Sequence, residues 1–343
     1  MNKLNILVAN SKLNSIGGSE TFSYTLISEL KKQGHFVEYF TFEKGLVSDK
    51  IENILGVFFK TKNKYDLILA NHNTCVEKLY GIGYIIQTCH GIFPKLEKPS
   101  IFSNAYVSIS QEIQESLSMH GISSKIILNG IDLSRFRCVN KLNNNLKSVL
   151  SLCHSIEANK LLKEVCLDLN IELKIAYKYD KPVFEIENKI NEVDLVIGLG
   201  RSAYEAMACG RPVVVWDNRK YFSSVGDGYV KNILGFSVIN NCSGRYLNKE
   251  YTKDDLKQEI LKYNHLDSIF FREFAEKKLN ITSVVHEYFD YYNSLNSSEF
   301  LKKKNNLALF CKIGKFNLLV LFKLMNRSYK LKKLKNFLIK VKI

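Results

Sequence analysis

The segment that decides the fold is residues 194–217, which read Asp-Leu-Val-Ile-Gly-Leu-Gly-Arg-Ser-Ala-Tyr-Glu-Ala-Met-Ala-Cys-Gly-Arg-Pro-Val-Val-Val-Trp-Asp. It opens with an apolar run, and a turn containing Gly198 and Gly200 follows. A short helical stretch then ends at Gly210, a residue type that commonly stops helices, and a second apolar run completes the segment. The order strand, glycine turn, helix, strand is typical of a parallel α/β sheet.

The glycine turn is compatible with two kinds of ligand chemistry. Gly198 and Gly200 let backbone amides approach an anion, and the helix start adds positive potential. Residues 198–203 also match the dinucleotide fingerprint G-x-G-x-x-A, and Asp217 stands where a ribose-binding acid belongs. The helix is shorter than a usual crossover, however, and the motif lies in the middle of the chain. A nicotinamide-dependent oxidoreductase therefore remains an alternative hypothesis.

Ser202 and Glu205 also fit a purely structural pattern. In a capping box, a serine at the helix start and a glutamate three residues later bond each other's backbone N–H groups. A helix that begins after Ser202 would explain Glu205 without any ligand. From spacing alone, the capping role and a binding role for Glu205 are equally open.

The same alternation of strands and helices runs through most of the chain and is interrupted by an Asn-rich break at 139–146. We predict two doubly wound, Rossmann-like α/β units that share a cleft at the carboxyl ends of their strands. The expected strands are 4–9, 36–42, 66–70, 84–89, 105–109, 125–128, 148–152, 172–176, 194–197 and 212–216, and the expected helices are 19–33, 111–120, 158–169, 183–191, 203–209, 252–264, 267–280 and 283–295. The expected boundaries are 1–138 for the acceptor-side domain, 147–296 for the nucleotide-binding domain and 297–343 for a tail.

Charge is distributed unevenly along the 343 residues. The chain has 49 Lys and Arg, 34 Asp and Glu, and a hydrophobic fraction of 46%, which is the composition of a globular protein. Thirteen of the positive charges fall within 301–343, where there is no acidic residue. The rest of the chain is nearly neutral, with 36 basic and 34 acidic residues. Because the basicity belongs to the tail, we expect no nucleic-acid partner.

The tail at 301–343 has apolar residues at three- and four-residue steps, with lysines over much of the remaining surface. This pattern predicts a basic amphipathic helix on an anionic membrane surface, although part of the stripe could instead pack on the domains. No apolar run reaches the roughly 18 residues that a transmembrane helix needs, and the N-terminus reads as a strand rather than a signal peptide. The eight cysteines include no Cys-x-x-Cys pair, which suits a reducing compartment and argues against a zinc site. We therefore expect a cytoplasmic protein attached peripherally to the inner face of the cell membrane.

The block at 198–214 resembles the donor-nucleotide segment of family-4 glycosyltransferases, a large retaining class with the GT-B fold. Three further segments agree with this resemblance in the right order: Gly17-Gly18-Ser19-Glu20 after the first strand, Thr88-Cys89-His90-Gly91 at the end of another, and Asn129-Gly130-Ile131-Asp132, followed by Phe136. The resemblance implies transfer of a sugar from a nucleotide-sugar donor to a glycan or glycolipid acceptor. It further implies retention of configuration, and neither a metal nor another cofactor.

The resemblance also implies roles for individual residues. In this family the developing charge falls on the departing diphosphate, which backbone amides and basic side chains stabilise. The implied catalytic residues are His90, Arg201 and Lys160, and the implied donor-binding residues are Gly17, Gly18, Gly198, Gly200, Ser202 and Glu205. His90 would lie beside the transferred sugar, and Glu205 would hold the ribose hydroxyls. The others would surround the diphosphate.

Two positions depart from the family pattern. Ile197 stands where the family usually has a second glutamate that contacts the sugar, and no arginine precedes Lys160 in the segment 151–160. A catalytically silent GT-B subunit is therefore a second hypothesis. The leading hypothesis is a hexosyltransferase of polysaccharide biosynthesis that acts on a lipid-linked or surface glycan.

Overall fold

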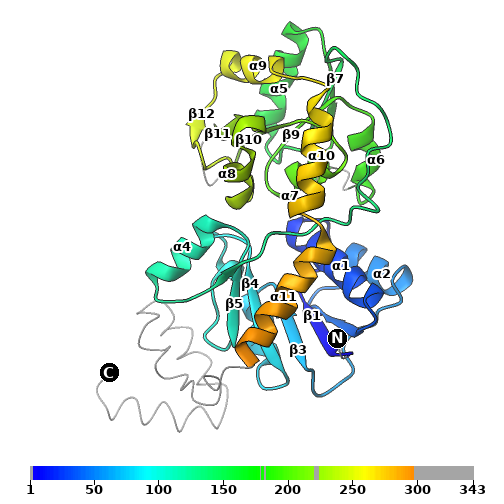
Figure 1. Cartoon of the computed structure of the whole chain (residues 1–343), viewed down its shortest axis with the longest axis vertical. Coiled ribbons are helices and arrows are strands. Elements are labelled where there is room, and N and C mark those ends of the chain that lie inside the picture. The colour runs from blue at the N-terminus through cyan, green and yellow to red at the C-terminus, as the bar shows by residue number, and fades with distance from the viewer. Residues whose placement is uncertain (1–2, 178, 181–182, 220–223, 297–343) are drawn as a thin grey trace.

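The computed structural model describes residues 3–177, 179–180, 183–219 and 224–296, so the tail predicted to lie on a membrane falls outside the described residues. Two sheets of six strands each form the centres of two domains, one above the other in Figure 1. Ten of these strands correspond to predicted ones, and helices separate the parallel strands in both sheets. The prediction of two doubly wound α/β units is confirmed.

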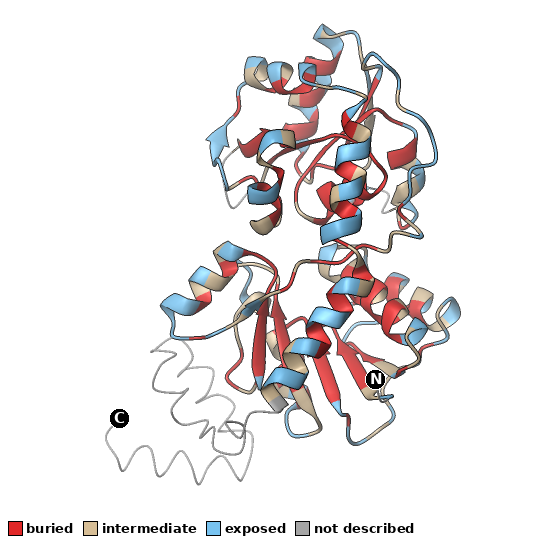
Figure 2. Cartoon of the chain, viewed as in Figure 1, coloured by how far each residue is buried: buried red, intermediate tan, exposed pale blue. Residues whose placement is uncertain are grey.

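The sheet of the first domain is entirely parallel, in the order β2-β1-β3-β4-β5-β6. Its strands are β1 (Asn5–Ala9), β2 (Phe36–Phe40), β3 (Leu67–Ala70), β4 (Tyr84–Cys89), β5 (Ala105–Ser108) and β6 (Lys125–Ile126). The central strand β3 reads Leu-Ile-Leu-Ala, and all four residues are buried. Such a continuous apolar run is typical of a parallel strand with helices on both faces, and Figure 2 shows the strands buried between exposed helical surfaces.

The helices of the first domain come from both ends of the chain. They are α1 (Gly18–Lys32), α2 (Leu46–Asn53), α3 (Asn73–Leu79), α4 (Gln111–Met119) and α11 (Ile281–Asn296). Helix α11 follows the second sheet in sequence but packs on the first one, along the sheet in Figure 1. Its apolar residues Val284, Val285 and Tyr288 join the same core as β1, β3 and α1. The chain therefore crosses between the domains twice.

The sheet of the second domain has the order β12-β11-β10-β9-β7-β8. Its strands are β7 (Ser148–Ser151), β8 (Glu172–Ile175), β9 (Leu195–Gly198), β10 (Val213–Asn218), β11 (Ser224–Tyr229) and β12 (Lys249–Glu250). The sequence does not predict β11, because glycine and aspartate disfavour strands. Its antiparallel pairing with β10 needs glycine at 226, where an added Cβ would lie 2.5 Å from the carbonyl oxygen of Val215. Close pairing, rather than propensity, accounts for this strand.

The helices of the second domain are α5 (Ile156–Asp168), α6 (Ile186–Asn191), α7 (Arg201–Ala208), α8 (Leu234–Ile239), α9 (Lys253–Leu261) and α10 (Asp267–Lys278). Helix α7 begins two residues before its predicted start, with Gly200 as its N-cap and no side-chain capping bond. The predicted capping box of Ser202 and Glu205 is therefore wrong, because Ser202 already lies inside the helix. Capping does not account for Glu205.

Two composition-based expectations can be compared with the described residues. Six of the seven cysteines in this part of the chain are buried, Cys138 is exposed, and none of the seven is paired. Within the same residues, no helix combines the length and the apolar character needed to cross a membrane.

Candidate active site

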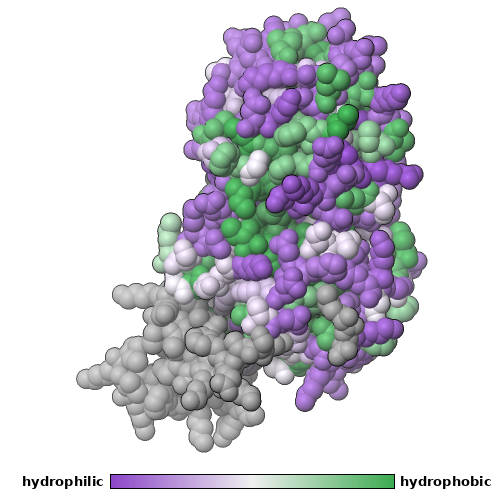
Figure 3. All heavy atoms as spheres, viewed as in Figure 1, coloured by the Kyte–Doolittle hydropathy of each residue, from purple (hydrophilic) through white to green (hydrophobic). Residues whose placement is uncertain are grey.

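A cleft of about 970 Å³ separates the two domains. Its lining comes from the loops that follow β1, β4 and β5 in the first domain and β7, β8, β9 and β10 in the second. These are the carboxyl ends of the strands, where doubly wound folds bind ligands. Figure 3 shows hydrophobic residues gathered in the middle of one face, where the two domains meet.

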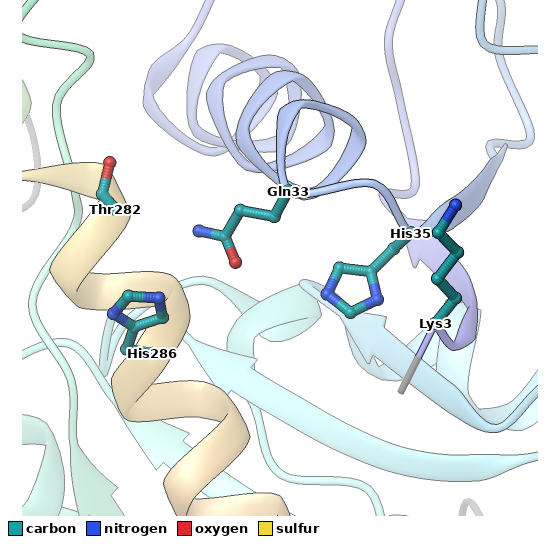
Figure 4. Close-up of a pocket in the computed structure, with 5 residues that line it drawn as sticks. All are labelled: Lys3, Gln33, His35, Thr282 and His286. Carbon is teal, nitrogen blue, oxygen red and sulfur yellow. The ribbon is translucent and has the colours of Figure 1, made fainter. Parts of the chain in front are cut away.

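A smaller hollow of about 310 Å³ lies on the first domain, between the end of α1 and helix α11 (Figure 4). Its lining includes Lys3, two residues before β1, and His35, directly before β2, so it lies near the amino ends of these strands. His286 of α11 closes the other side. Because this hollow is at the opposite end of the strands from the cleft, the cleft is the candidate active site.

The glycine turn before α7 forms one wall of the cleft. Gly200 has a φ of 62° and a ψ of −129°, a backbone conformation that glycine adopts without strain, and its N–H donates to the carbonyl of Cys242 at 2.9 Å. The first residues of the helix, Arg201 and Ser202, have backbone N–H groups without an intrahelical acceptor. Both residues line the cleft. The turn therefore offers an anion-binding helix start.

Glu205 lies one helical turn further along α7 and also lines the cleft. Its Oε1 accepts a hydrogen bond from Nε of Arg201 at 2.9 Å, whereas Oε2 has no partner among the described residues. Burial raises the pKa of Glu205, and the nearby guanidinium groups of Arg201 and Arg135 offset part of this effect. The free oxygen can accept hydrogen bonds from ligand hydroxyls.

Arg201 connects the two domains. In addition to Glu205, it donates from Nη1 to the carbonyl of Gly130 and from Nη2 to Oγ1 of Thr25 on α1, both at 2.9 Å. The side chain is buried, and this burial lowers its pKa. All three side-chain nitrogens of Arg201 have protein partners. Arg201 therefore forms part of the cleft wall and links the two domains by hydrogen bonds. A direct contact with a diphosphate stays a prediction.

Of the predicted site residues, some line the cleft and others do not. Lys160 is exposed on α5 and is not part of the cleft lining, and Gly198 is buried at the end of β9 behind the turn. Seven of the nine predicted residues do line the cleft, namely Gly17, Gly18, His90, Gly200, Arg201, Ser202 and Glu205. The structure thus brings together segments that are far apart in the sequence.

Three further arginines line the cleft that the sequence analysis does not single out: Arg135, Arg219 and Arg245. Arg135 donates to the carbonyl of Phe184 and to Glu187, and Arg245 pairs with Glu112 across the two domains. Only Arg135 has a sequence signal, since it lies three residues after the Asn-Gly-Ile-Asp segment and directly before Phe136. These guanidinium groups supply positive charge on the cleft wall, a role predicted for Lys160.

Asp217, the candidate ribose-binding acid of the dinucleotide hypothesis, is fully buried. Its carboxylate accepts from the N–H groups of His154 at 3.1 Å and Asn218 at 2.8 Å, and it pairs with Arg219 at 2.9 Å. A carboxylate with these partners has little capacity left for a ribose. The geometry therefore does not favour the oxidoreductase alternative.

The first domain contributes the start of α1 to the opposite wall. Gly17 is the N-cap of this helix in an extended conformation, and no side chain caps it. An added Cβ at Gly17 would lie 2.3 Å from Oε2 of Glu20, whereas one at Gly18 would meet nothing within 4 Å. The α1 start therefore faces open space at Gly18, whereas the carboxylate of Glu20 lies beside Gly17. Helix-start amides without a side-chain cap favour anions.

His90 follows β4 and is partly buried in the same wall. Its Nε2 lies 3.0 Å from Oδ1 of Asn71, and its backbone N–H donates to Oε2 of Glu97 at 2.8 Å. The rings of Phe22 and His90 pack in a T-shaped arrangement, with their centres 5.5 Å apart. Burial lowers the pKa of His90 to about 4, so the ring is neutral at pH 7.

Ile197, at the position of the missing family glutamate, is fully buried in the core of the second domain with Trp216. It does not line the cleft, where the carboxylates are Glu97, Glu157 and Glu205. Across the described ranges, no group of three or more His, Cys, Asp or Glu residues is placed to hold a metal ion.

The cleft also holds two buried oxygens without a partner. Among the residues that the structure describes, three buried side-chain polar atoms lack a hydrogen bond, and two of them are Oδ1 of Asn129 and Oδ1 of Asn241. Both residues line the cleft, one on each domain. Because buried polar atoms are nearly always paired in native proteins, a ligand or an ordered water would complete these two oxygens.

No protein-family model matches this sequence, and no curated protein matches it. Solved structures do resemble the fold. A crystal structure of a glycosyltransferase from Rickettsia africae ESF-5 has a TM-score of 0.58 at 13% identity, over 87% of this chain and 100% of that one. An alpha-glucosyltransferase in complex with UDP-glucose and DNA containing an abasic site has a TM-score of 0.53 at 11% identity, over 85% and 99% of the two chains. The fold is GT-B, as predicted.

Proposed function

We propose that this protein is a glycosyltransferase that moves a sugar from a nucleotide-sugar to an acceptor. The observation that carries the proposal is the convergence, in one interdomain cleft, of two uncapped helix starts and the free carboxylate oxygen of Glu205. The two helix starts suit a diphosphate, and the carboxylate suits ribose hydroxyls. The similar fold of an alpha-glucosyltransferase whose structure holds UDP-glucose supports a nucleotide-sugar donor.

In this proposal, catalysis is electrostatic stabilisation of the leaving group. The diphosphate gains negative charge as its bond to the sugar breaks, and preorganised donors in a partly dry cleft stabilise that charge. The amides of Arg201 and Ser202 are the donors on the second domain, and the guanidinium of Arg135, which pairs with Glu187, lies nearby. The start of α1 at Gly18 faces them from the first domain. No protein nucleophile and no metal are needed.

The finer proposals concern stereochemistry, acceptor and location. We propose a retaining reaction with a hexose donor and a lipid-linked or surface-glycan acceptor, on the inner face of the cell membrane. The basic tail at 301–343 supports this location, because each Lys or Arg near anionic lipid contributes about 1 kcal/mol to binding. If the acceptor is lipid-linked, a membrane-bound tail would hold the enzyme at the surface that carries its acceptor.

A panel of UDP- and GDP-sugars tests the proposed reaction, with nucleotide release measured on the purified protein and NADH binding measured in parallel. We expect binding of one nucleotide class and release of nucleotide from its sugar, faster with an added glycan acceptor. Binding without release would support the silent-subunit alternative. Binding of NADH alone would refute the glycosyltransferase proposal.

Liposome sedimentation tests the tail separately. The full chain should sediment with anionic vesicles, and roughly 0.5 M salt should weaken this binding by screening. A chain that ends at Glu299 should remain in the supernatant. Equal binding by the truncated chain, or no binding by either form, would contradict the membrane role.

A further inference from the structure

A buried polar network lies behind His90 at the carboxyl ends of the first-domain strands. Asn10 follows β1, Ser23 belongs to α1 and Asn71 follows β3, and each of the three is at most 1% exposed. Asn10 donates from Nδ2 to Oγ of Ser23 at 3.0 Å, and Asn71 donates from Nδ2 to the same oxygen at 2.7 Å. Oδ1 of Asn71 then lies 3.0 Å from Nε2 of His90.

The backbone fixes the direction of these hydrogen bonds at the far end of the network. Oγ of Ser23 lies 2.8 Å from the carbonyl oxygen of Ser19, and a carbonyl can only accept, so the hydroxyl proton points there. The N–H of Lys12, which can only donate, lies 3.2 Å from Oδ1 of Asn10. Asn10 therefore presents its NH₂ group to Ser23. The two anchors are backbone groups whose donor and acceptor roles are not in question.

These anchors determine the orientation of Asn71. Because the hydroxyl of Ser23 donates its hydrogen bond to the carbonyl of Ser19, its oxygen can only accept from Asn71, which must present Nδ2 to it. The carbonyl oxygen of Asn71 therefore faces His90. An amide oxygen has no proton to give, so Nε2 of His90 carries the proton of this hydrogen bond.

The other ring nitrogen of His90 remains available. Nδ1 has no partner among the described residues, and His90 lines the cleft. The titratable groups near the ring are Glu97, which favours the imidazolium, and His72 and Arg201, which disfavour it. Burial outweighs Glu97 and holds the pKa at about 4, so the single proton stays on Nε2 at neutral pH.

We propose that Asn71, oriented by Ser23, is a positioning residue that holds His90 as the Nε2–H tautomer and leaves Nδ1 as a bare acceptor in the cleft. A bare nitrogen accepts a hydrogen bond from a hydroxyl group, but it cannot donate one to a phosphate oxygen. His90 therefore binds a hydroxyl of the transferred sugar and not the diphosphate. This last step rests on the proposed function, whereas the tautomer does not.

Nitrogen-15 NMR on histidine-labelled full-length protein tests the tautomer directly, because protonated and bare ring nitrogens have distinct shifts. The wild-type His90 should show a protonated Nε2 and a bare Nδ1 that stay unchanged from pH 6 to 8. Asn71→Leu, which removes the acceptor, should give a mixture or the opposite tautomer. Asn71→Asp keeps an acceptor oxygen beside Nε2 but adds a negative charge that raises the pKa of His90, so its neutral ring should show the Nε2–H form at the alkaline end of this range, near pH 8.

Two further variants keep the test decisive if Asn71→Leu does not fold. Ser23→Ala removes the group that orients Asn71, so the amide can turn and the His90 tautomers should mix. Asn104→Leu is the matched control, because its Oδ1 accepts from the N–H of Ile85 at the amino ends of the strands, away from the cleft. A protonated Nδ1 in the wild type, or a tautomer that no change at Asn71 or Ser23 alters, overturns the proposal.

The nucleotide-release assay tests the sugar contact. Asn71→Leu should lower kcat by about tenfold, less than the roughly hundredfold or more that a positioned acid or base contributes, with the donor KM changed less than about threefold. Asn71→Asp should recover most of the loss near pH 8, where its His90 ring is neutral. If the tautomer changes and kcat does not, Nδ1 does not serve the sugar. If the wild type releases no nucleotide, the proposed function fails, while the NMR result still decides the tautomer.

Discussion

The two walls of the cleft share one sequence pattern, a glycine turn before a helix, but glycine is present in each for a different physical reason. At the start of α7, Gly200 has a φ of 62° and a ψ of −129°, which side chains rarely adopt. At the start of α1, Gly17 has a φ of −155°, an extended conformation open to any residue. Gly18 faces open space. The second domain therefore needs glycine for its backbone conformation, whereas the first keeps glycine where a ligand can approach.

The side chains of the two walls differ as well. Glu205 and Arg201 form a buried ion pair on the second domain, and Arg201 continues into the first through Thr25. The first domain instead offers the neutral ring of His90 and a network of amides and a hydroxyl. We infer that the second wall governs nucleotide binding and the first wall governs turnover. The predictions below test that division.

The largest effect is expected from Gly200→Ala. A side chain at this φ and ψ costs about 1–3 kcal/mol of stability and shifts the start of α7. Nucleotide affinity should fall roughly a hundredfold, as expected when one or two hydrogen bonds to a charged group are lost. Titration calorimetry with UDP and GDP and a thermal melt measure the two effects. Unchanged affinity would show that the turn does not bind the nucleotide.

Glu205→Gln should weaken nucleotide binding by about 1–3 kcal/mol, the scale of a hydrogen bond to a charged group. Glutamine can still accept from Arg201, so the domain contact should survive. The matched control is Glu259→Gln, a buried carboxylate on α9 whose Oε2 accepts from the N–H of Tyr229. The control should affect the melting temperature only. Equal affinity in both variants would remove Glu205 from the nucleotide site.

On the first wall, His90→Ala should lower turnover by at least about tenfold while the donor KM changes little. The imidazole is already neutral at pH 7, so the wild-type rate should show no titration of His90 between pH 6 and 8. Initial rates across this range, together with nucleotide titration of the variant, measure both effects. A variant with wild-type turnover would exclude His90 from the reaction.

The smallest effect is expected from Gly18→Ala. Alanine at the first helical position should stabilise the protein by up to about 1 kcal/mol, because it removes freedom from the unfolded chain. Donor affinity should change by less than about threefold if the phosphates approach the amide from the side away from Cβ. Chemical denaturation and calorimetry measure both. A large loss of affinity without a loss of stability would show close contact between the ligand and Gly18.

Much of the fold could be predicted because the sequences of buried parallel strands are continuous runs of apolar residues. Strand β4 has the predicted bounds, Tyr84–Cys89. Strand β11 has no such signal, since its glycines fit tertiary pairing with β10 and not local propensity. Helix α2, at Leu46–Asn53, is also missing from the prediction, because its eight residues present only a brief apolar pattern between loops.

The candidate site also has features that the sequence predicts and features that it does not. The places of Gly200 and Glu205 follow from a local motif, and the structure puts both in the cleft. The partners of Arg201 cannot be deduced from the sequence, because Thr25 lies 176 residues away. Asn71 has only a weak signal, as a polar residue at the end of a buried strand. Its contact with His90 depends on the spacing of neighbouring strands, which the sequence does not state.

The return of α11 to the first domain has a consequence for biosynthesis. A chain leaves the ribosome N-terminus first, and domains generally fold as units in that order. Here Val284, Val285 and Tyr288 belong to the core of the first sheet, so that core is incomplete until almost all of the described chain has emerged. The first domain to be synthesised is thus the last to be finished. A nascent chain stalled within the second domain would expose this apolar face, where chaperones bind.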